Sequence, residues 1–187
     1  MSEVESKFYY TGLSSPLETI YDTVDTIKWT QGKDTDQYQI LVDQSLILKD
    51  PMLAAIHDRC RGVMTLLMLP PKNMYAWHKD IENVCNISLY SSTENKWLCF
   101  YAENEYEHPW YVMDPPINRV SSYRPLLETR IEPRKWTMIN AQAWHAGWNF
   151  NDYPVYQLVY CVKFKSGLVY KDVEQMVKQY KKDNNLL

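Results

Sequence analysis

Two short stretches of the sequence carry side chains that could bind a metal ion together. The first is His78-Lys79-Asp80, and the second contains His145, far along the chain. Two imidazoles and one carboxylate on one side of a metal leave coordination positions open, which suits non-haem Fe(II) oxygenases, whereas a closed structural site uses four ligands. The pattern predicts a metal site of His78, Asp80 and His145. Ordinary polar turn residues are the alternative.

The context of these residues favours the metal site, because a single H-x-D tripeptide is weak evidence by itself. Asp80 lies just ahead of a predicted strand, and His145 lies just beyond the end of another. Strand ends of a barrel can converge at its mouth. In the strand 83–90, side chains alternate between two faces. The polar face, which we expect to line a cosubstrate cavity, carries Asn86, Ser88 and Tyr90.

The composition describes a nearly neutral chain. Its 187 residues have the length of one domain. The net charge of −3, from 20 basic and 23 acidic residues, gives no indication of nucleic acid or an anionic membrane as the main partner, and we expect neither. No apolar stretch approaches the roughly 20 residues that span a bilayer, and the first residues lack the pattern of a secretory signal. We therefore expect a cytoplasmic protein, in the host cell cytoplasm if the source is viral. The oligomeric state stays open.

The cysteines and aromatic residues add two expectations. The 4 cysteines form no C-x-x-C pair, so we expect free buried thiols rather than zinc ligands or disulfides. The chain has 7 Trp and 15 Tyr but only 4 Phe, and buried Trp and Tyr rings need a hydrogen-bond partner. This excess suits a cavity with a polar interior, although a tyrosine-rich core or partner surface would give the same composition.

The N-terminal third is predicted to be largely helical. Ser15-Pro16-Leu17-Glu18 resembles a capping box and begins a helix over 16–28, and a second helix is expected over 51–61, ended by Gly62. A short strand is expected over 37–42. The apolar run at 63–69 predicts a buried strand.

The remainder is predicted to be mainly β-structure followed by a helix. Short segments rich in Val, Ile, Tyr and Trp are separated by polar turns, and a helical pattern begins at Val169 and ends at Lys181-Lys182. This order favours one domain, residues 1–187, with an antiparallel barrel or sandwich and helices packed outside it. The predicted strands are 83–90, 96–102, 109–113, 127–132, 135–140 and 155–164.

Three segments together resemble a known family. H-K-D at 78–80, Asn86–Tyr90, and NAQAWHAGWN at 140–149 are similar to the H-x-D…H signature of 2-oxoglutarate- and Fe(II)-dependent oxygenases, especially prolyl- and aspartyl-hydroxylase-like members of the kind also encoded by bacteriophages. The resemblance covers about residues 63–164. It implies a double-stranded β-helix (a cupin-like jelly roll), iron held by His78, Asp80 and His145, and 2-oxoglutarate as cosubstrate. The implied reaction is hydroxylation of an aliphatic carbon, with a protein or peptide side chain as one substrate class.

One family feature is missing. The family usually places Arg or Lys about ten residues after the distal histidine, where it pairs with the far carboxylate of 2-oxoglutarate, but nothing basic lies between His145 and Lys163. A dicarboxylate buried without a cation would be costly. Some branches of the family carry a lysine at about the distance of Lys96 after the motif, so Lys96 is the first candidate and Lys163 the second. Hydroxyl donors could come from Tyr90 and Tyr156.

The missing cation leaves two alternatives open. One is a jelly-roll binding or structural protein, for instance a phage-encoded assembly component, in which the same residues bind a structural metal or none. The other is a cupin-like metalloprotein that does not use 2-oxoglutarate. Turnover of the cosubstrate would distinguish all three functions, whereas the fold alone cannot, since jelly rolls host many functions.

Overall fold

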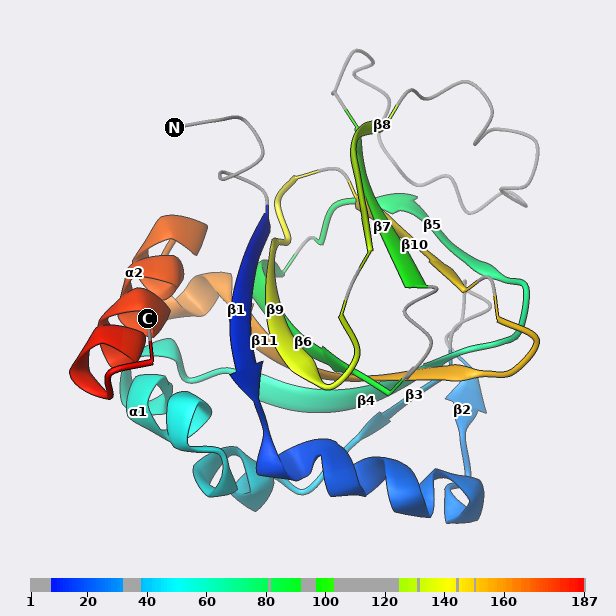
Figure 1. Cartoon of the computed structure of the whole chain (residues 1–187), viewed down its shortest axis with the longest axis horizontal. Helices are drawn as coiled ribbons and strands as arrows, with labels where there is room; N and C mark the ends of the chain where they lie inside the picture. Colours follow the sequence, from blue (N-terminus) through cyan, green and yellow to red (C-terminus); the bar gives the residue numbers. More distant parts are fainter. Residues whose placement is uncertain are drawn as a thin grey trace.

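A computed structural model describes residues 8–31, 38–80, 82–91, 97–102, 125–130, 132–143, 145–149 and 151–186, with the backbone alone at 74–78, 97–102, 125–130 and 148. The strands form two antiparallel sheets (Figure 1). The larger sheet has the order β1-β9-β6-β11-β4-β3-β2, and the smaller has the order β5-β10-β7-β8. Their bounds are β1 Phe8–Ser14, β2 Thr30–Gln31, β3 Tyr38–Leu41, β4 Val63–Leu69, β5 Met74–His78, β6 Asn83–Tyr90, β7 Trp97–Ala102, β8 Pro125–Arg130, β9 Lys135–Asn140, β10 His145–Asn149 and β11 Val155–Lys163.

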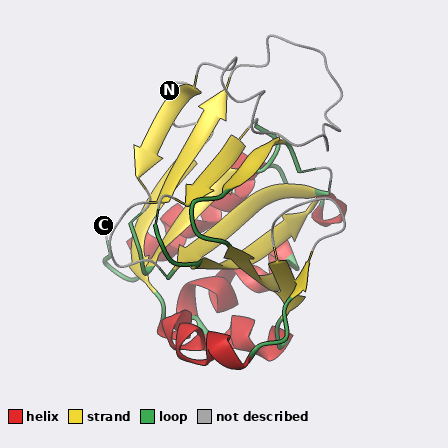
Figure 2. Cartoon of the chain, turned by 90° about the vertical axis from the view of Figure 1, so that its right-hand side faces the viewer, coloured by secondary structure: helices red, strands yellow, loops and turns green. Residues whose placement is uncertain are grey.

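The helices cover one face of the larger sheet, and the smaller sheet lies on its other side (Figures 1 and 2). Helices α1 (Pro51–Cys60) and α2 (Tyr170–Asp183) contribute Leu53, Ile56 and Val173 to the main hydrophobic core. Residues on the helix-covered face of β4, β6, β9 and β11 complete this core. The 3₁₀-helices η2 (Pro16–Thr26), η3 (Gln44–Lys49) and η6 (Phe164–Ser166) complete the helical elements. None of the described helices is long and apolar enough to cross a membrane.

The alternation predicted for β6 is confirmed. Cys85, Ile87 and Leu89 are completely buried in the core against the helices. Asn86, Ser88 and Tyr90 therefore lie on the opposite face, toward the smaller sheet. We call this second face the inner face of the larger sheet.

The N-terminal helices differ from the prediction in detail. The segment over Pro16–Thr26 is a 3₁₀-helix rather than an α-helix, and the hydroxyls of Thr19, Thr23 and Thr26 each donate to the carbonyl three residues earlier. Such local bonds and the β-branched residues both disfavour the α-helix. The C-cap of α1 is Arg61, in the left-handed conformation, rather than Gly62.

Most predicted strands are present with bounds within two residues. The strand predicted over 109–113 lies outside the described residues, as does residue 131 of the strand predicted over 127–132. Strands β1, β2, β5 and β10 were not predicted. Cys60 and Cys85 are buried free thiols as expected, and Cys161 is partly buried and also free. Burial raises the pKa of Cys60 to about 11.

Candidate metal centre

The two candidate histidines meet across a pair of strands. His78 is the last residue of β5 and His145 is the first residue of β10, and the antiparallel pairing places the two residues directly opposite each other. A β-bulge follows at once, because two residues of β5, Ala76 and Trp77, oppose Ala146 alone. Bulges of this kind bend a strand and re-aim its side chains, and they are common beside active sites.

His145 has its tautomer set by the main chain. The side chain is 6% exposed, and its Nδ1 lies 2.9 Å from the carbonyl oxygen of Ala143. A carbonyl only accepts hydrogen bonds, so Nδ1 carries the proton and donates it. In the neutral ring, Nε2 is then the unprotonated nitrogen with the lone pair that a divalent metal requires.

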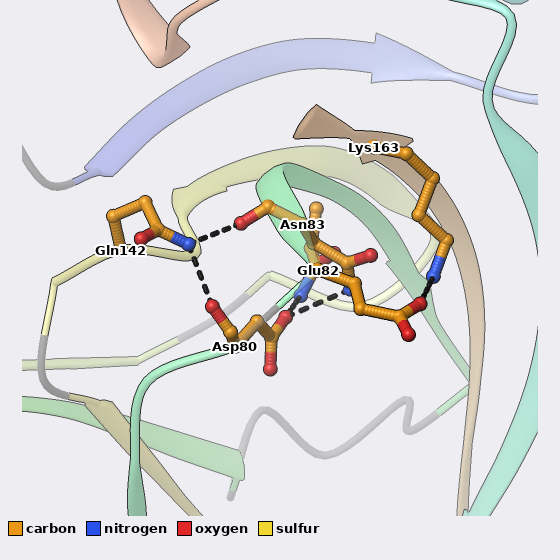
Figure 3. A network of polar contacts seen from close by, with 6 residues as sticks. Asp80, Glu82, Asn83, Gln142 and Lys163 are labelled. Carbon is orange, nitrogen blue, oxygen red and sulfur yellow. Dashed lines mark hydrogen bonds and ion pairs between the residues drawn. The ribbon is translucent and has the colours of Figure 1, made fainter. Parts of the chain in front are cut away.

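Asp80 is tied to its surroundings by both its main chain and its side chain. Its main-chain N–H donates to the carbonyl of Ala141 at 2.8 Å, and its own carbonyl accepts from Gln142 Nε2 at 2.6 Å. The carboxylate oxygen Oδ2 accepts from Asn86 Nδ2 at 2.6 Å and from Asn83 Nδ2 at 2.9 Å. Figure 3 shows the side-chain nitrogen of Gln142 directed toward both Asp80 and Asn83. These bonds fix where the carboxylate lies.

The turn between β9 and β10 connects the two candidate ligands. Ala141 and Gln142 bond to Asp80, and Ala143 accepts from His145. The turn is itself closed by the bond from the N–H of Ala143 to the carbonyl of Asn140, 3.0 Å long. A change in this turn would therefore move Asp80 and His145 together.

The structure thus brings the three predicted ligands to one end of the β5–β10 pair. Among the side chains that the structure describes, no three of His, Cys, Asp and Glu gather into a metal site, and the side chain of His78 lies outside that set. The convergence of the three donor atoms on one metal therefore stays a prediction. The backbone pairing and the hydrogen bonds of Asp80 and His145 are what support it.

Polar groups line part of the inner face of the larger sheet, near the candidate metal ligands. Ser88 is fully buried and its hydroxyl accepts from Gln157 Nε2 at 2.8 Å. Thr137 of β9 pairs with Ser88 across the sheet, and its buried Oγ1 has no hydrogen-bond partner among the described residues. Tyr90 lies on the same face, where it packs with Leu69 and nearby apolar residues. Such hydroxyl and amide groups can bind a carboxylate.

Two of the other predicted cosubstrate residues, Tyr156 and Lys163, do not join this group. Tyr156 stacks on Trp29 with ring centroids 5.7 Å apart and packs against the core on the helix side, because it alternates with Gln157 along β11. Lys163 forms an ion pair with Glu82 at 3.1 Å. Lys96 lies outside the described residues.

Sequence reasoning missed four polar residues near the site. Asn83 begins the predicted strand 83–90 and Gln142 lies within NAQAWHAGWN, but neither received a role. Asn83 contacts Asp80 through its side chain, and the contact of Gln142 depends on the β9–β10 turn. Thr137 and Gln157 were not recognised as neighbours of Ser88. Thr137 and Gln157 could have been found as polar residues within strands that are otherwise rich in apolar residues.

Comparisons with solved structures identify proteins of the same fold. HygX from Streptomyces hygroscopicus, with nickel and 2-oxoglutarate bound, has a TM-score of 0.54 at 10% identity over 84% of each chain. EvdO2 from Micromonospora carbonacea var. aurantiaca has a TM-score of 0.53 at 14% identity, over 85% of this chain and 88% of that one. The non-haem α-ketoglutarate-dependent carbocyclase SnoK, from nogalamycin biosynthesis, has a TM-score of 0.51 at 11% identity, over 84% and 80%.

These similarities confirm the predicted jelly-roll fold. At identities of 10–14% they carry the fold and not the reaction. No protein-family model matches the sequence, and no curated protein matches it significantly. The function therefore has to be argued from the residues of the site.

Proposed function

We propose that the chain is an Fe(II)- and 2-oxoglutarate-dependent dioxygenase that hydroxylates an aliphatic carbon, with a protein or peptide side chain among its substrates, and that it acts in the cytoplasm. The observation that carries the proposal is the position of His78 directly opposite His145, with Asp80 bonded to the turn that leads into His145. Two imidazoles and one carboxylate are the ligand set of non-haem Fe(II) oxygenases.

The residues present fit such a metal. The hydrogen bond at Nδ1 of His145 leaves Nε2 as its ligand atom, and the carboxylate of Asp80 would offset part of the metal charge. When bound, Fe(II) would supply the activation of O₂ coupled to decarboxylation of the 2-oxo acid. The protein's own residues would hold the ligands in place, and the buried inner face would keep water away from the reacting groups.

The inner face is our proposed binding site for 2-oxoglutarate. Ser88, Thr137 and Gln157 provide hydroxyl and amide groups there, and Tyr90 lies beside them. The far carboxylate needs a cation, for which Lys96 is our first candidate and Lys163 our second. Lys163 would have to exchange its partner Glu82 for the cosubstrate, and its side chain is 27% exposed. The same fold binds 2-oxoglutarate in HygX and EvdO2.

Anaerobic titration tests the proposal. Metal-stripped protein is given Fe(II) and then 2-oxoglutarate, and the visible charge-transfer band of the chelated complex is followed. We expect the band in the unaltered protein and in Asp152→Ala, which removes an exposed aspartate paired with Lys72. We expect no tight Fe(II) binding in Asp80→Ala. Stoichiometric Fe(II) retained by Asp80→Ala would refute the metal site.

The same titration separates the candidate cations. Loss of the cation that pairs with a buried carboxylate should weaken 2-oxoglutarate binding by about 30-fold or more. Lys96→Ala should have this effect, and Lys163→Ala should not. Lys49→Ala, which removes an exposed lysine from η3, is the control. Iron binding with no band in the unaltered protein would favour the metalloprotein that does not use 2-oxoglutarate.

A further inference from the structure

We propose that Asn86 and Asn83 are positioning residues that hold Oδ2 of Asp80, so that only Oδ1 binds the metal. This inference rests on the proposed function, because it concerns the same metal site. It gives Asn86 a role different from the cosubstrate contact expected from the sequence. The two amides would thereby set the number of coordination positions that stay open for cosubstrate and O₂.

The hydrogen bonds to Oδ2 carry the inference. A carboxylate oxygen has two lone pairs in its plane, and Oδ2 accepts two N–H bonds, 2.6 Å from Asn86 and 2.9 Å from Asn83. With both lone pairs of Oδ2 engaged, a metal at this carboxylate is left with Oδ1. A two-oxygen attachment would have to break one of these bonds and would fill a further coordination position.

The donors are uncharged, which suits a metal ligand. An amide orients a carboxylate without bringing a second cation that would compete with the metal for its charge. The nearby cation Lys163 pairs with Glu82 instead (Figure 3). The carboxylate can therefore be held firmly by its neighbours and still offer its negative charge to the metal.

A closed set of bonds links Asn83 to Asp80 through Gln142. Gln142 Nε2 donates to the carbonyls of both Asp80 and Asn83, so the main chain and the side chain of Asn83 are both linked to Asp80. The Oδ1 atoms of Asn83 and Asn86 are buried and have no hydrogen-bond partner among the described residues. A buried unpaired carbonyl costs about 1–3 kcal/mol, so the bonds to Asp80 are what fix the direction of these amides.

The test uses Co(II) as the probe metal and two readouts that do not depend on turnover. One is the Co(II) dissociation constant from calorimetry. The other is the infrared difference spectrum of the loaded and metal-free protein, in which the asymmetric and symmetric carboxylate stretches lie closer together when both oxygens bind. The carboxylate bands of Asp80 are identified by their absence from Asp80→Ala.

We expect Asn86→Ala to weaken Co(II) binding by about 10- to 100-fold and to narrow the separation of the Asp80 stretches. Asn83→Ala should do the same to a smaller extent, and it provides the test if Asn86→Ala does not fold. Asn151→Ala is the matched control, because Asn151 is also buried and its amide donates to Asn149, at the other end of β10. It should lower stability and leave both Co(II) readouts unchanged.

The outcomes distinguish failure of the positioning role from failure of the proposed function. If the unaltered protein binds Co(II), Asp80→Ala does not, and both asparagine variants match the unaltered protein, the positioning role is refuted and the metal site stands. If the unaltered protein does not bind Co(II), the proposed function fails and the positioning role fails with it. A weaker affinity in Asn151→Ala equal to that in Asn86→Ala would show a general loss of structure and would also refute the positioning role.

Discussion

Gly62 shows how little room the core leaves at a single residue. Its N–H donates to the hydroxyl of Tyr160 at 2.9 Å, and the same hydroxyl lies 2.8 Å from Nδ1 of His57. A Cβ added at Gly62 would stand 2.5 Å from Cζ of Tyr160 and 2.8 Å from the carbonyl oxygen of Cys161. The ring is fully buried and the carbonyl belongs to β11, so neither can move freely.

We predict that Gly62→Ala lowers the free energy of unfolding by roughly 1–3 kcal/mol through this overpacking. Urea denaturation measures the change. Gly167→Ala is the control, because a Cβ there meets nothing within 4 Å and the cost of its φ of +74° is about 1 kcal/mol. A Gly62→Ala variant no less stable than Gly167→Ala would contradict the steric argument.

At the same scale, residue types alone pointed to the candidate ligands but not to the groups that contact Asp80. His78, Asp80 and His145 were identified because few residue types bind metals in this pattern. Asn83 and Gln142 were not, since asparagine and glutamine occur in many turns, and only the fold brings Gln142 to the carbonyl of Asp80. Hydrogen-bond partners across a turn leave no periodic signal in the sequence.

At the scale of the elements, the strands that carry the site were the hardest to predict. The alternating pattern at 83–90 and the apolar run at 63–69 correctly predicted β6 and β4, two central strands of the larger sheet. Strands β5 and β10 have five residues each, and the sequences MYAWH and HAGWN show no clear alternation of apolar and polar residues. Their pairing is between distant segments and includes a bulge, so it is decided by tertiary contacts.

A second feature at this scale is a buried carboxylate that joins three elements. Asp50, 1% exposed, caps α1 by accepting from the N–H of Leu53 at 2.9 Å. Its Oδ2 also accepts from the hydroxyl of Ser15, ahead of η2, at 2.5 Å and from Nε1 of Trp136 in β9 at 2.9 Å. Asp50 therefore fixes α1 and η2 against the sheet that supports the candidate site.

We predict that Asp50→Ala lowers the free energy of unfolding by about 2–5 kcal/mol, since it removes a helix cap and leaves the Trp136 N–H buried without its acceptor. Thermal and urea denaturation measure the loss. Asp43→Ala is the matched control: Asp43 caps η3 through the N–H of Ser45, but it is exposed. Asp43→Ala should lower the free energy of unfolding clearly less than Asp50→Ala does. Equal decreases in the two variants would argue against burial as the cause.

At the scale of the whole molecule, burial on both faces of the larger sheet keeps several acidic groups protonated. Burial raises the pKa of Cys60 to about 11 and, with a contribution from the charge of Asp80, that of Cys161 to about 12. Burial also raises the pKa of the Cys85 thiol and of the Tyr21 and Tyr160 phenols. All of these groups favour the folded state only while they carry their protons.

The direction of the pH dependence follows from proton binding. An unfolded cysteine ionises near pH 8.5, so above that pH the folded chain binds more protons than the unfolded chain, and stability must fall as the pH rises. The contribution of the thiols is complete below about pH 8.5 and is lost progressively toward pH 11–12. We predict a constant urea midpoint from pH 7 to 8 and a falling one from pH 9 to 11, at fixed ionic strength.

The thiols can be separated from the tyrosines, because unfolded tyrosine ionises only near pH 10. Between pH 8.5 and 10 the fall should come mainly from the cysteines, so the double variant Cys60→Ala/Cys161→Ala should lose stability less steeply with pH in this range than the unaltered protein. The difference in slope should persist until the folded thiols ionise near pH 11–12, and above that range the two proteins should show the same slope. An unchanged slope below pH 10 in the double variant would mean that these two thiols are not held protonated by the fold.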